Sequence, residues 1–432
     1  MMRSHYAADV TPNLDGKRVT LAGWVHETRD LGGLLFIVLR DRSGLIQITL
    51  KKKECEPDLA KIATHLVKEE AIVCEGVVKA SKIASGGREV IPEELAVVGR
   101  VVKTVPFEVT GKVPADLDVR LDHRPIDLRR KETSAVFKIR HFVQKAFRDK
   151  LCEMGFREIT PPCLVSTSTE GGADLFSVKY FEKNAFLAQS PQLYKQLAVI
   201  GGMDKVFMIT PVFRAEKHNT LIHLNESTQM DAEMGFADDE DALGVLEKTV
   251  LHILSEVKKN CTEEIALLKA DFEIPSKIPR FSYDEVLSAL EKKGVRMKWG
   301  EDFSKENEEK IPSAVGEELF IIRDWPTKAR AFYSMPHEDN PEICKAYDLV
   351  FQGLEIASGA QRVHTPELLV AQLKAHGLKP ASFEDYVDGF RFGSVPHAGW
   401  SIGTERLLMK LANRENIREC ALFPRDRHRL TP

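Results

Sequence analysis

Residues 1–105 contain an ordered series of short β-rich segments, and this series restricts the fold more than any other feature of the chain. Five segments rich in β-branched and apolar residues are separated by Gly or charged turns: 19–29, 34–44, 45–50, 71–81 and 93–102. The segment 57–70 has helical character and falls between the third and the fourth of them. Five strands with one helix after the third predict a Greek-key barrel of the OB type, a fold that commonly binds single-stranded nucleic acid on one face.

The β-rich pattern ends before residues 106–133, where Pro, Gly and charged residues show no sustained period. We expect this segment to be a hinge between two domains. An amphipathic helix should begin at Ser134, because apolar residues from Val136 to Leu151 recur at helical spacing, and Gly155 is a suitable C-terminal stop. Beyond it, helices alternate with β-rich segments such as 206–214, 242–260, 319–325, 331–335 and 346–359. Residues 134–432 therefore predict an α+β domain built on a mostly antiparallel sheet flanked by helices.

Composition excludes several classes of protein. The sequence has no run of about 18 apolar residues and no apolar N-terminal region, so we expect a cytoplasmic protein with no membrane partner. Its seven cysteines are scattered and odd in number, which favours reduced thiols over disulfides or a zinc site. The formal net charge of -4 gives no bulk sign of a nucleic-acid partner; residues 120–150 are a local basic candidate, or simply a solvated charged face.

The usual nucleotide and hydrolase motifs are absent from the sequence. It has no G-x-x-x-x-G-K-[ST] loop, no G-x-G-x-x-G after a strand, no H-E-x-x-H and no G-x-S-x-G. Any phosphate chemistry would therefore depend on arginines and on acidic metal ligands.

Two segments in the first half of the second domain carry suggestive polar groups. In 155–165, Pro161 and Pro162 interrupt a β-rich run, which fits a strand edge or an interface, or equally a simple turn. In 212–236, Arg214 and Glu216 end an apolar strand and should face one side, and an acidic strand with Asp231 follows. A surface hairpin would explain the second segment as well.

Two further segments lie towards the C-terminus. In 346–362, Asp348 and Glu355 lie on apolar strands near Ser358, and paired acids with a hydroxyl can hold magnesium. In 399–411, Gly403 precedes a helix that carries Arg406, so the backbone there could approach a ligand closely. A loop-to-helix junction without function is the alternative for the last segment.

Taken together and in this order, these segments resemble the three signature motifs of class II aminoacyl-tRNA synthetases, most closely the aspartyl enzymes of the archaeal type. The resemblance covers essentially the whole chain and is carried by TEGGADLF, FLAQSPQLYKQ, FRAEKHNT, NPEICKAYDL and NIRECALFPRDR. It implies an anticodon-binding OB domain, a catalytic domain with a seven-stranded sheet, and a homodimer with the Pro162 segment at the interface. It also implies that ATP, with two or three Mg2+ ions, activates L-aspartate as an adenylate for transfer to tRNA.

The resemblance further implies a role for each matching residue. ATP would be bound by Arg214, Glu216, His223, Leu224, Glu355, Gly403, Glu405 and Arg406, and the metal by Glu355 and Ser358 with Asp348 as a helper. Aspartate would be bound by Glu170, Ser190, Gln192, Lys195, Arg214, Asp231, Ser358 and Arg362, and catalysis would rest on Arg214, Glu355 and Arg406. Lys195 and Arg362 would hold the substrate's side-chain carboxylate. Two buried cations would need an anion, which favours aspartate over neutral asparagine.

Two positions depart from the pattern of relatives, with small expected effects. Ser401 replaces the first glycine of the third motif and could narrow the approach to adenine, and Ala360 stands where relatives often have glycine.

On the barrel, the resemblance implies that Phe36 stacks on the central anticodon base, although a buried barrel Phe is the alternative. The anticodon candidates are His26, Arg29, Phe36, Gln47, Glu75 and Ser85. Relatives restricted to tRNA(Asp) carry Trp and Lys at or near the positions of His26 and Ser85, so we expect an enzyme that also charges tRNA(Asn), upstream of a tRNA-dependent amidotransferase. Two rivals stay open: an asparaginyl-tRNA synthetase, against which Lys195 argues, and a non-catalytic RNA-binding paralogue.

Overall fold

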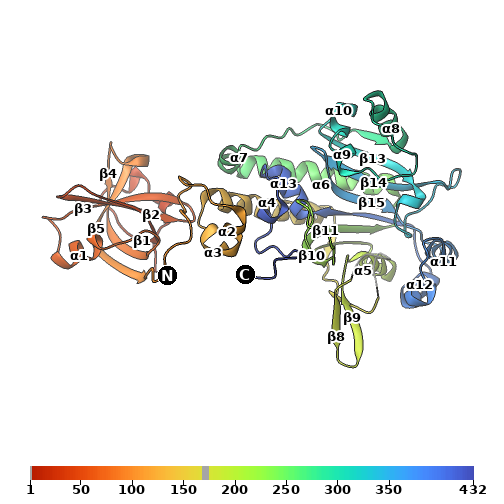
Figure 1. Cartoon of the computed structure of the whole chain (residues 1–432), viewed down its shortest axis with the longest axis horizontal. Helices are drawn as coiled ribbons and strands as arrows, with labels where there is room; N and C mark the ends of the chain where they lie inside the picture. Colours follow the sequence, from red (N-terminus) through yellow and green to blue (C-terminus); the bar gives the residue numbers. More distant parts are fainter. Residues whose placement is uncertain (1, 168–174) are drawn as a thin grey trace. The chain divides into compact units, whose positions relative to one another are not determined.

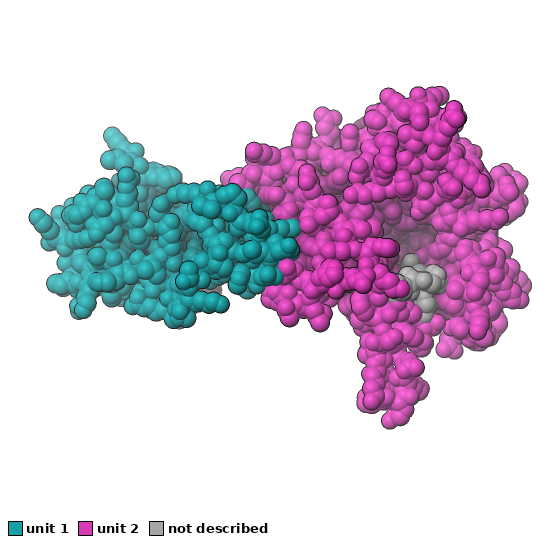
Figure 2. All heavy atoms as spheres, in the orientation of Figure 1, with its two compact units in different colours: residues 1–134 teal, residues 135–432 magenta. Residues whose placement is uncertain are grey.

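The computed structural model describes residues 2–167 and 175–432. Contacts between Cα atoms divide the chain into two compact units, Met1–Ser134 and Ala135–Pro432, which Figure 2 shows in different colours. Within the described ranges, no helix is both long and apolar enough to cross a membrane.

The first unit contains a closed five-stranded barrel with strand order β1-β2-β3-β5-β4, as the sequence predicts. Its strands are β1 (Arg18–Asp30), β2 (Leu34–Asp41), β3 (Gly44–Lys51), β4 (Ala71–Ala80) and β5 (Arg88–Gly99), and helix α1 (Pro57–Thr64) follows β3. Alternate residues such as Leu21, Ile37 and Ile48 are fully buried in the barrel core. The intervening residues therefore point outward, where they can meet a ligand.

The segment 106–133 contains two short helices that the sequence pattern does not predict: α2 (Leu117–Asp122) and α3 (Arg124–Asp127). Arg124 and Asp127 form a buried ion pair of 2.5 Å. Arg129 ion-pairs with Glu69 at 3.0 Å and stacks on Trp24, so this segment packs on the barrel. Ion pairs and not apolar periodicity hold these helices, which is why the segment resembled an unstructured hinge; a hinge role stays a prediction.

The second unit is built on an eight-stranded, mostly antiparallel sheet with strand order β12-β13-β14-β15-β16-β11-β10-β6. Its strands are β6 (Arg157–Glu158), β10 (Lys205–Phe213), β11 (Glu226–Gly235), β12 (Arg280–Ser282), β13 (Leu319–Pro326), β14 (Ile343–Phe351), β15 (Leu354–Gln361) and β16 (His397–Gly403). The expected number of seven strands is wrong. The edge strands β6 and β12 pair in parallel and have only two and three residues, too short to leave a pattern in the sequence.

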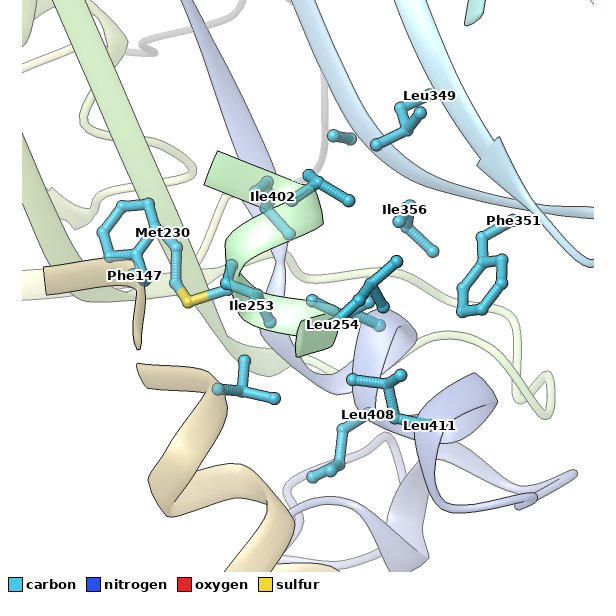
Figure 3. Close-up of a cluster of buried hydrophobic side chains, with 14 of the residues drawn as sticks. Phe147, Met230, Ile253, Leu254, Leu349, Phe351, Ile356, Ile402, Leu408 and Leu411 are labelled. Atoms are coloured by element: carbon cyan, nitrogen blue, oxygen red, sulfur yellow. The ribbon is translucent and has the colours of Figure 1, made fainter. Parts of the chain in front are cut away.

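Three helices cover one face of this sheet: α4 (Lys131–Glu153), α6 (Asp239–Asn260) and α13 (Thr404–Leu411). Their apolar stripes meet the sheet in one buried cluster, where Phe147 and Ile253 lie beside Met230 of β11 and Leu408 lies near Leu411 (Figure 3). The expectation that 242–260 is β-rich is wrong. Its apolar residues recur at helical spacing, and a capping box at Asp238 starts the helix.

The remaining helices and strands surround the sheet (Figure 1). A small sheet contains β7 (Leu164–Val165), β9 (Lys183–Leu187) and β8 (Ser177–Tyr180), and residues 331–335 form no strand. The helices are α5 (Gln192–Ala198), α7 (Thr262–Leu268), α8 (Tyr283–Lys292), α9 (Lys305–Glu308), α10 (Ile311–Val315), α11 (Pro366–Ala375) and α12 (Glu384–Arg391). A π-helical turn (Val199–Met203) and the 3-10 turns Ala7–Asp9, Pro12–Leu14, Ser85–Gly87, Thr327–Ala329, Pro380–Phe383 and Ile417–Glu419 complete the fold.

Candidate active site

A cavity of about 350 Å³ opens on the sheet face opposite the three covering helices. The alternation of side chains along β11 assigns each residue to one face of the sheet: Met230 and Ala232 enter the core, whereas Gln229 and Asp231 line the cavity. Strands β15 and β16, the loop after β10, the start of α5, the segment 329–334, the start of α13 and Ile417 complete its wall. Most residues that the sequence singled out therefore meet in one place.

Arg362 lines one end of the cavity, and it converges with Lys195 on the carboxylate of Glu233; Lys195 and Glu233 themselves lie behind the cavity wall. Arg362 grips this carboxylate with two nitrogens, at 2.9 and 3.0 Å, while the Lys195 ammonium lies 3.6 Å from it. Lys195 also binds Asp231 at 2.6 Å. These four side chains are almost fully buried. The expectation of two cations awaiting an anion is therefore wrong, because each cation already faces a carboxylate of the protein.

The two buried carboxylates differ in their ionisation. Burial raises the pKa of Glu233, but the neighbouring Arg362 and Lys195 cations outweigh burial and leave it below its usual range. Burial also raises the pKa of Asp231, and Lys195 and the Ser401 hydroxyl at 3.0 Å offset it only in part. Ser401 thus donates to the acidic cluster and also lines the cavity, and its expected effect on the approach to adenine stays a prediction.

Two guanidinium groups are left to face a ligand. Arg362 uses Nε and Nη2 on Glu233, and its Nη1 makes no hydrogen bond within the described part of the chain. Arg214 lies just after β10, lines the same cavity, and its side chain likewise has no hydrogen bond to any described residue. The cavity therefore offers unengaged donors to an anionic ligand.

At the other end, Arg406 at the start of α13 holds His223 and Glu355 together. Its guanidinium donates to His223 Nε2 at 3.1 Å and to the Glu355 carbonyl at 3.2 Å. Burial lowers the pKa of His223, and an Nε2 that accepts from Arg406 is consistent with a neutral ring. Glu216 and Leu224 line this end too.

A β-bulge places Glu355 beside Ser358. Ser358 pairs with Asp348 across β14 and β15, and the register shifts at Ile356. Residues three apart in a regular strand face opposite sides, so this extra residue lets Glu355 and Ser358 line the same cavity. Burial and the neighbouring Asp348 carboxylate raise the pKa of Glu355 to about 7, against the opposing Arg406 and Arg330 cations.

Arg330, which the sequence analysis missed, engages both oxygens of Asp348, at 2.7 and 2.5 Å, and the Ser358 hydroxyl at 2.7 Å. It also stacks on the Trp325 ring at 4.7 Å. Arg330 therefore engages Asp348 and Ser358 alike, and each oxygen keeps a lone pair beside the Glu355 carboxylate, so the role of Asp348 as a metal helper stays a prediction. No group of three or more metal-ligating His, Cys, Asp or Glu side chains occurs among residues 2–167 and 175–432. Such a sparse donor set fits Mg2+ held mainly by substrate phosphates and water.

Three other predicted residues have specific positions. Gly403 lines the cavity as the N-cap of α13. The carboxylate of Glu405 is taken by Arg140 at 2.8 Å and by the Thr228 amide at 2.9 Å, so its contacts are structural. Glu170 lies outside the described residues.

On the barrel, the outward faces of β1 to β3 bring Arg29 and Phe36 together as a cross-strand pair. Phe36 is half-buried on this face, so the alternative of a barrel-core Phe is wrong. Gln47 of β3 donates to Glu89 at 3.0 Å, an acidic group that the sequence analysis missed. Glu75 lies apart from this group and pairs with Arg18.

His26 lies at a bulge in β1, where the register shifts between Val25 and Glu27. Its Nδ1 accepts a hydrogen bond from Arg40 at 3.0 Å, and Arg40 in turn forms a buried ion pair with Glu69. Ser85 is exposed in the turn between β4 and β5.

Comparison with known proteins places this architecture in a family. The model for "tRNA synthetases class II (D, K and N)" matches residues 116–427, and that for "OB-fold nucleic acid binding domain" matches residues 19–98. The chain therefore belongs to the class II tRNA synthetases and is an aminoacyl-tRNA synthetase with an N-terminal OB-fold domain.

The relatives narrow the family further. A protein of Archaeoglobus fulgidus is 49% identical over 99% of both chains, and one of Methanocaldococcus jannaschii is 48% identical over 100% of this chain and 98% of its own. Both are named Aspartate--tRNA(Asp/Asn) ligase. Among solved structures, asparaginyl-tRNA synthetase from Pyrococcus horikoshii with asparaginyl-adenylate is 35% identical with a TM-score of 0.95 over 100% of both chains. Aspartyl tRNA synthetase from Entamoeba histolytica is 31% identical with a TM-score of 0.89, over 99% of this chain and 92% of that one.

Proposed function

We propose that this chain is an aspartate–tRNA ligase that charges both tRNA(Asp) and tRNA(Asn) with L-aspartate. One observation carries the proposal: a single cavity joins the Arg362–Glu233–Lys195 cluster at one end to the cations Arg214 and Arg406. Such a cavity suits an acidic amino acid at one end and a nucleoside triphosphate at the other.

The proposed reaction has two steps. An oxygen of the aspartate α-carboxylate bonds to the α-phosphorus of ATP, and the bond from that phosphorus to pyrophosphate breaks. A ribose hydroxyl of the terminal adenosine of the tRNA then attacks the carbonyl carbon of the adenylate and loses its proton, and AMP leaves. The first nucleophile is already an anion, so positioning and charge neutralisation carry the catalysis.

The residues of the cavity fit these tasks. Arg214 bridges the α-phosphate and the attacking carboxylate, since its planar fork serves two oxygens at once. Arg406 and His223 face the outer phosphates, and Glu216 and Leu224 bound the adenine. Glu355 and Ser358 would hold magnesium, which supplies positive charge to the departing pyrophosphate when it is bound.

Selection of aspartate over asparagine rests on a hydrogen-bond donor of the protein that no acceptor among the described residues engages. The free Nη1 of Arg362 can only donate, so it can pair with either oxygen of a side-chain carboxylate but only with the carbonyl oxygen of an amide, whose NH2 group would then face the cations without an acceptor. The protein carboxylates Asp231 and Glu233 keep Lys195 and Arg362 in place without occupying that nitrogen. Asparagine would therefore leave a buried polar group unpaired, which is costly.

The tRNA would be read by the barrel, where Phe36 offers a stacking surface and Arg29 and Gln47 offer polar contacts. His26 leaves a smaller side chain than the Trp of restricted relatives at the bulge of β1, which favours acceptance of both anticodons. We retain residues 1–105 as the anticodon-binding domain, 106–133 as the link and 134–432 as the catalytic domain.

The proposal includes a homodimer in the cytoplasm. In the 155–165 segment Pro161 is buried but Pro162 is exposed, so Pro162 is available to a second copy of the chain. All seven cysteines are free thiols, which suits a reducing compartment.

Two assays test the proposal. Pyrophosphate exchange should depend on L-aspartate and not on L-asparagine; the reverse result would make the protein an asparaginyl-tRNA synthetase. Purified tRNA(Asp) and tRNA(Asn) transcripts should then both accept aspartate. A rate on tRNA(Asn) below about a hundredth of that on tRNA(Asp), a gap of roughly 2.7 kcal/mol, would exclude dual charging.

A further inference from the structure

A buried chain of hydrogen bonds leads from the backbone to the wall of the cavity. His397 Nδ1 lies 2.7 Å from the carbonyl oxygen of Val395, and His397 Nε2 lies 2.9 Å from Gln196. Gln196 lies 2.9 Å from Gln192, which lines the cavity, and 2.9 Å from the Tyr386 hydroxyl. His397, Gln196, Gln192 and Tyr386 are all at most 5% exposed, so water does not supply alternative partners.

The donor and acceptor roles along this chain follow one another from the fixed carbonyl. A carbonyl oxygen only accepts, so His397 Nδ1 carries the proton. Burial lowers the pKa of His397, which keeps its ring neutral and its Nε2 an acceptor. The Gln196 atom that meets Nε2 must then be its NH2 group, so its carbonyl oxygen faces Gln192 and Tyr386.

The last step fixes the residue at the cavity. The carbonyl oxygen of Gln196 accepts, so Gln192 must turn its NH2 group towards Gln196 and its own Oε1 away. That Oε1 has no hydrogen bond to any residue that the structure describes. Both oxygens of Asp231, which also lines the cavity, already accept hydrogen bonds from Lys195 and Ser401.

We propose that His397 and Gln196 are positioning residues that fix the polarity of the Gln192 amide, so that its carbonyl oxygen faces the ammonium group of the amino-acid substrate. This inference rests on the proposed function for the identity of the substrate. The polarity itself rests on the hydrogen-bond chain and on the neutral ring of His397 and does not depend on the substrate. Neither positioning residue touches the substrate; each acts through its neighbour, and a neutral amide oxygen then gives the ammonium an acceptor in a site rich in cations.

The substrate part of the inference is tested with two ligands that differ in the amine. Aspartate and succinate share both carboxylates, but succinate has no ammonium. Binding of each is measured by titration calorimetry without ATP, for the wild type, for Gln196→Met and for Tyr386→Phe. Met has a similar length to Gln but cannot orient Gln192, whereas Phe removes only a second donor to the same oxygen.

We expect Gln196→Met to weaken aspartate binding about tenfold, the size of one hydrogen bond to a charged group, and to change succinate binding less than about twofold. Tyr386→Phe should leave the binding of both aspartate and succinate within about threefold of the wild type. A general loss of packing would weaken both ligands alike, and that result, or unchanged aspartate binding in Gln196→Met, would overturn the inference.

The polarity is tested without any substrate. In protein labelled with 15N-histidine, the His397 signal is assigned by its loss in His397→Asn and should show a proton on Nδ1 and none on Nε2. A proton on Nε2 would overturn the relay even if Gln196→Met failed to fold. A wild type that binds no aspartate would refute the proposed function, while the histidine spectrum would still decide the relay.

Discussion

Replacement of Lys195 by Met gives the sharpest test of the charge cluster. Lys195 is fully buried between Asp231 at 2.6 Å and Glu233 at 3.6 Å, and it donates to the Trp400 carbonyl at 3.2 Å. Met has nearly the same length, so the change removes a charge and leaves almost no cavity. Three of the four charges then remain, and they sum to one uncompensated negative charge.

The expected loss of stability follows from the kind of contact removed. Breaking a buried ion pair by deleting one partner costs about 3–5 kcal/mol, because the other charge stays buried without compensation. The unit 135–432 has roughly 300 residues. With an unfolding entropy of about 2.1 cal/mol/K per residue, this loss lowers its Tm by about 5–8 °C.

The loss should depend on pH in a definite direction. The pKa of Asp231 is already raised by burial, and loss of the Lys195 ammonium raises it further. The native variant then binds a proton that the unfolded chain releases, so its stability is highest at low pH and declines as pH rises through that pKa. Each pH unit below it restores about 1.4 kcal/mol, until the pKa of the unfolded chain near 3.9 is reached.

Thermal unfolding at pH 5.5 and pH 8 measures both the loss of stability and its dependence on pH. Lys195→Met should show the larger deficit at pH 8, and the double variant Lys195→Met with Asp231→Asn should recover much of it, because it buries no unpaired charge. Aspartate-dependent exchange should be lost in both. The reasoning fails if the single variant melts within about 1 °C of the wild type, or if its deficit is the same at both values of pH.

Three further results are expected. Arg330→Met should lower stability by about 3–5 kcal/mol and weaken MgATP binding in titrations, since it strips a buried aspartate of its partner; an unchanged Tm would contradict this. Gly359→Ala should cost about 1–3 kcal/mol in thermal unfolding, because its new Cβ would lie 2.4 Å from the Tyr347 ring, whereas the matched control Gly244→Ala meets nothing within 4 Å and should be neutral or stabilising. Phe36→Ala should weaken tRNA binding by roughly 1–3 kcal/mol, the free energy of one base stack, and so raise the KM for tRNA while pyrophosphate exchange stays unchanged. A fall in exchange would refute a role confined to the barrel.

The barrel was predictable because its information is local. Alternation along single strands, such as Leu35, Ile37 and Leu39 of β2 entering the core, is visible in the sequence and fixes which side chains point out. The same holds for α4, which begins three residues before the predicted Ser134 and ends before the predicted stop at Gly155. The ion-paired helices α2 and α3 escaped, since charge contacts leave no period, and in the second unit α6 was expected as a β-rich segment.

The order of the polar motifs, and the resemblance they carry, also lay in the sequence. It named Lys195, Arg362, Arg214 and Arg406 as members of one site, and they do share the wall of one cavity or its buried cluster. What it could not give was their pairing. The contact between Lys195 and Glu233 joins α5 to the middle of the sheet. Residues so far apart along the chain meet only because of the order in which the strands pair.

Tertiary structure alone decided three features on which the chemistry depends. Glu233 and Asp231 pair with the buried cations Lys195 and Arg362, Arg330 engages both oxygens of Asp348, and an extra residue at Ile356 turns Glu355 to the side of Ser358. Each is a matter of register between strands or of side chains meeting across the sheet. Periodicity reports which face a residue occupies, whereas the partner it meets on that face is set only when the strands pair. The sequence therefore determined the fold and most members of the site, and the structure determined their partners and added Glu233 and Arg330.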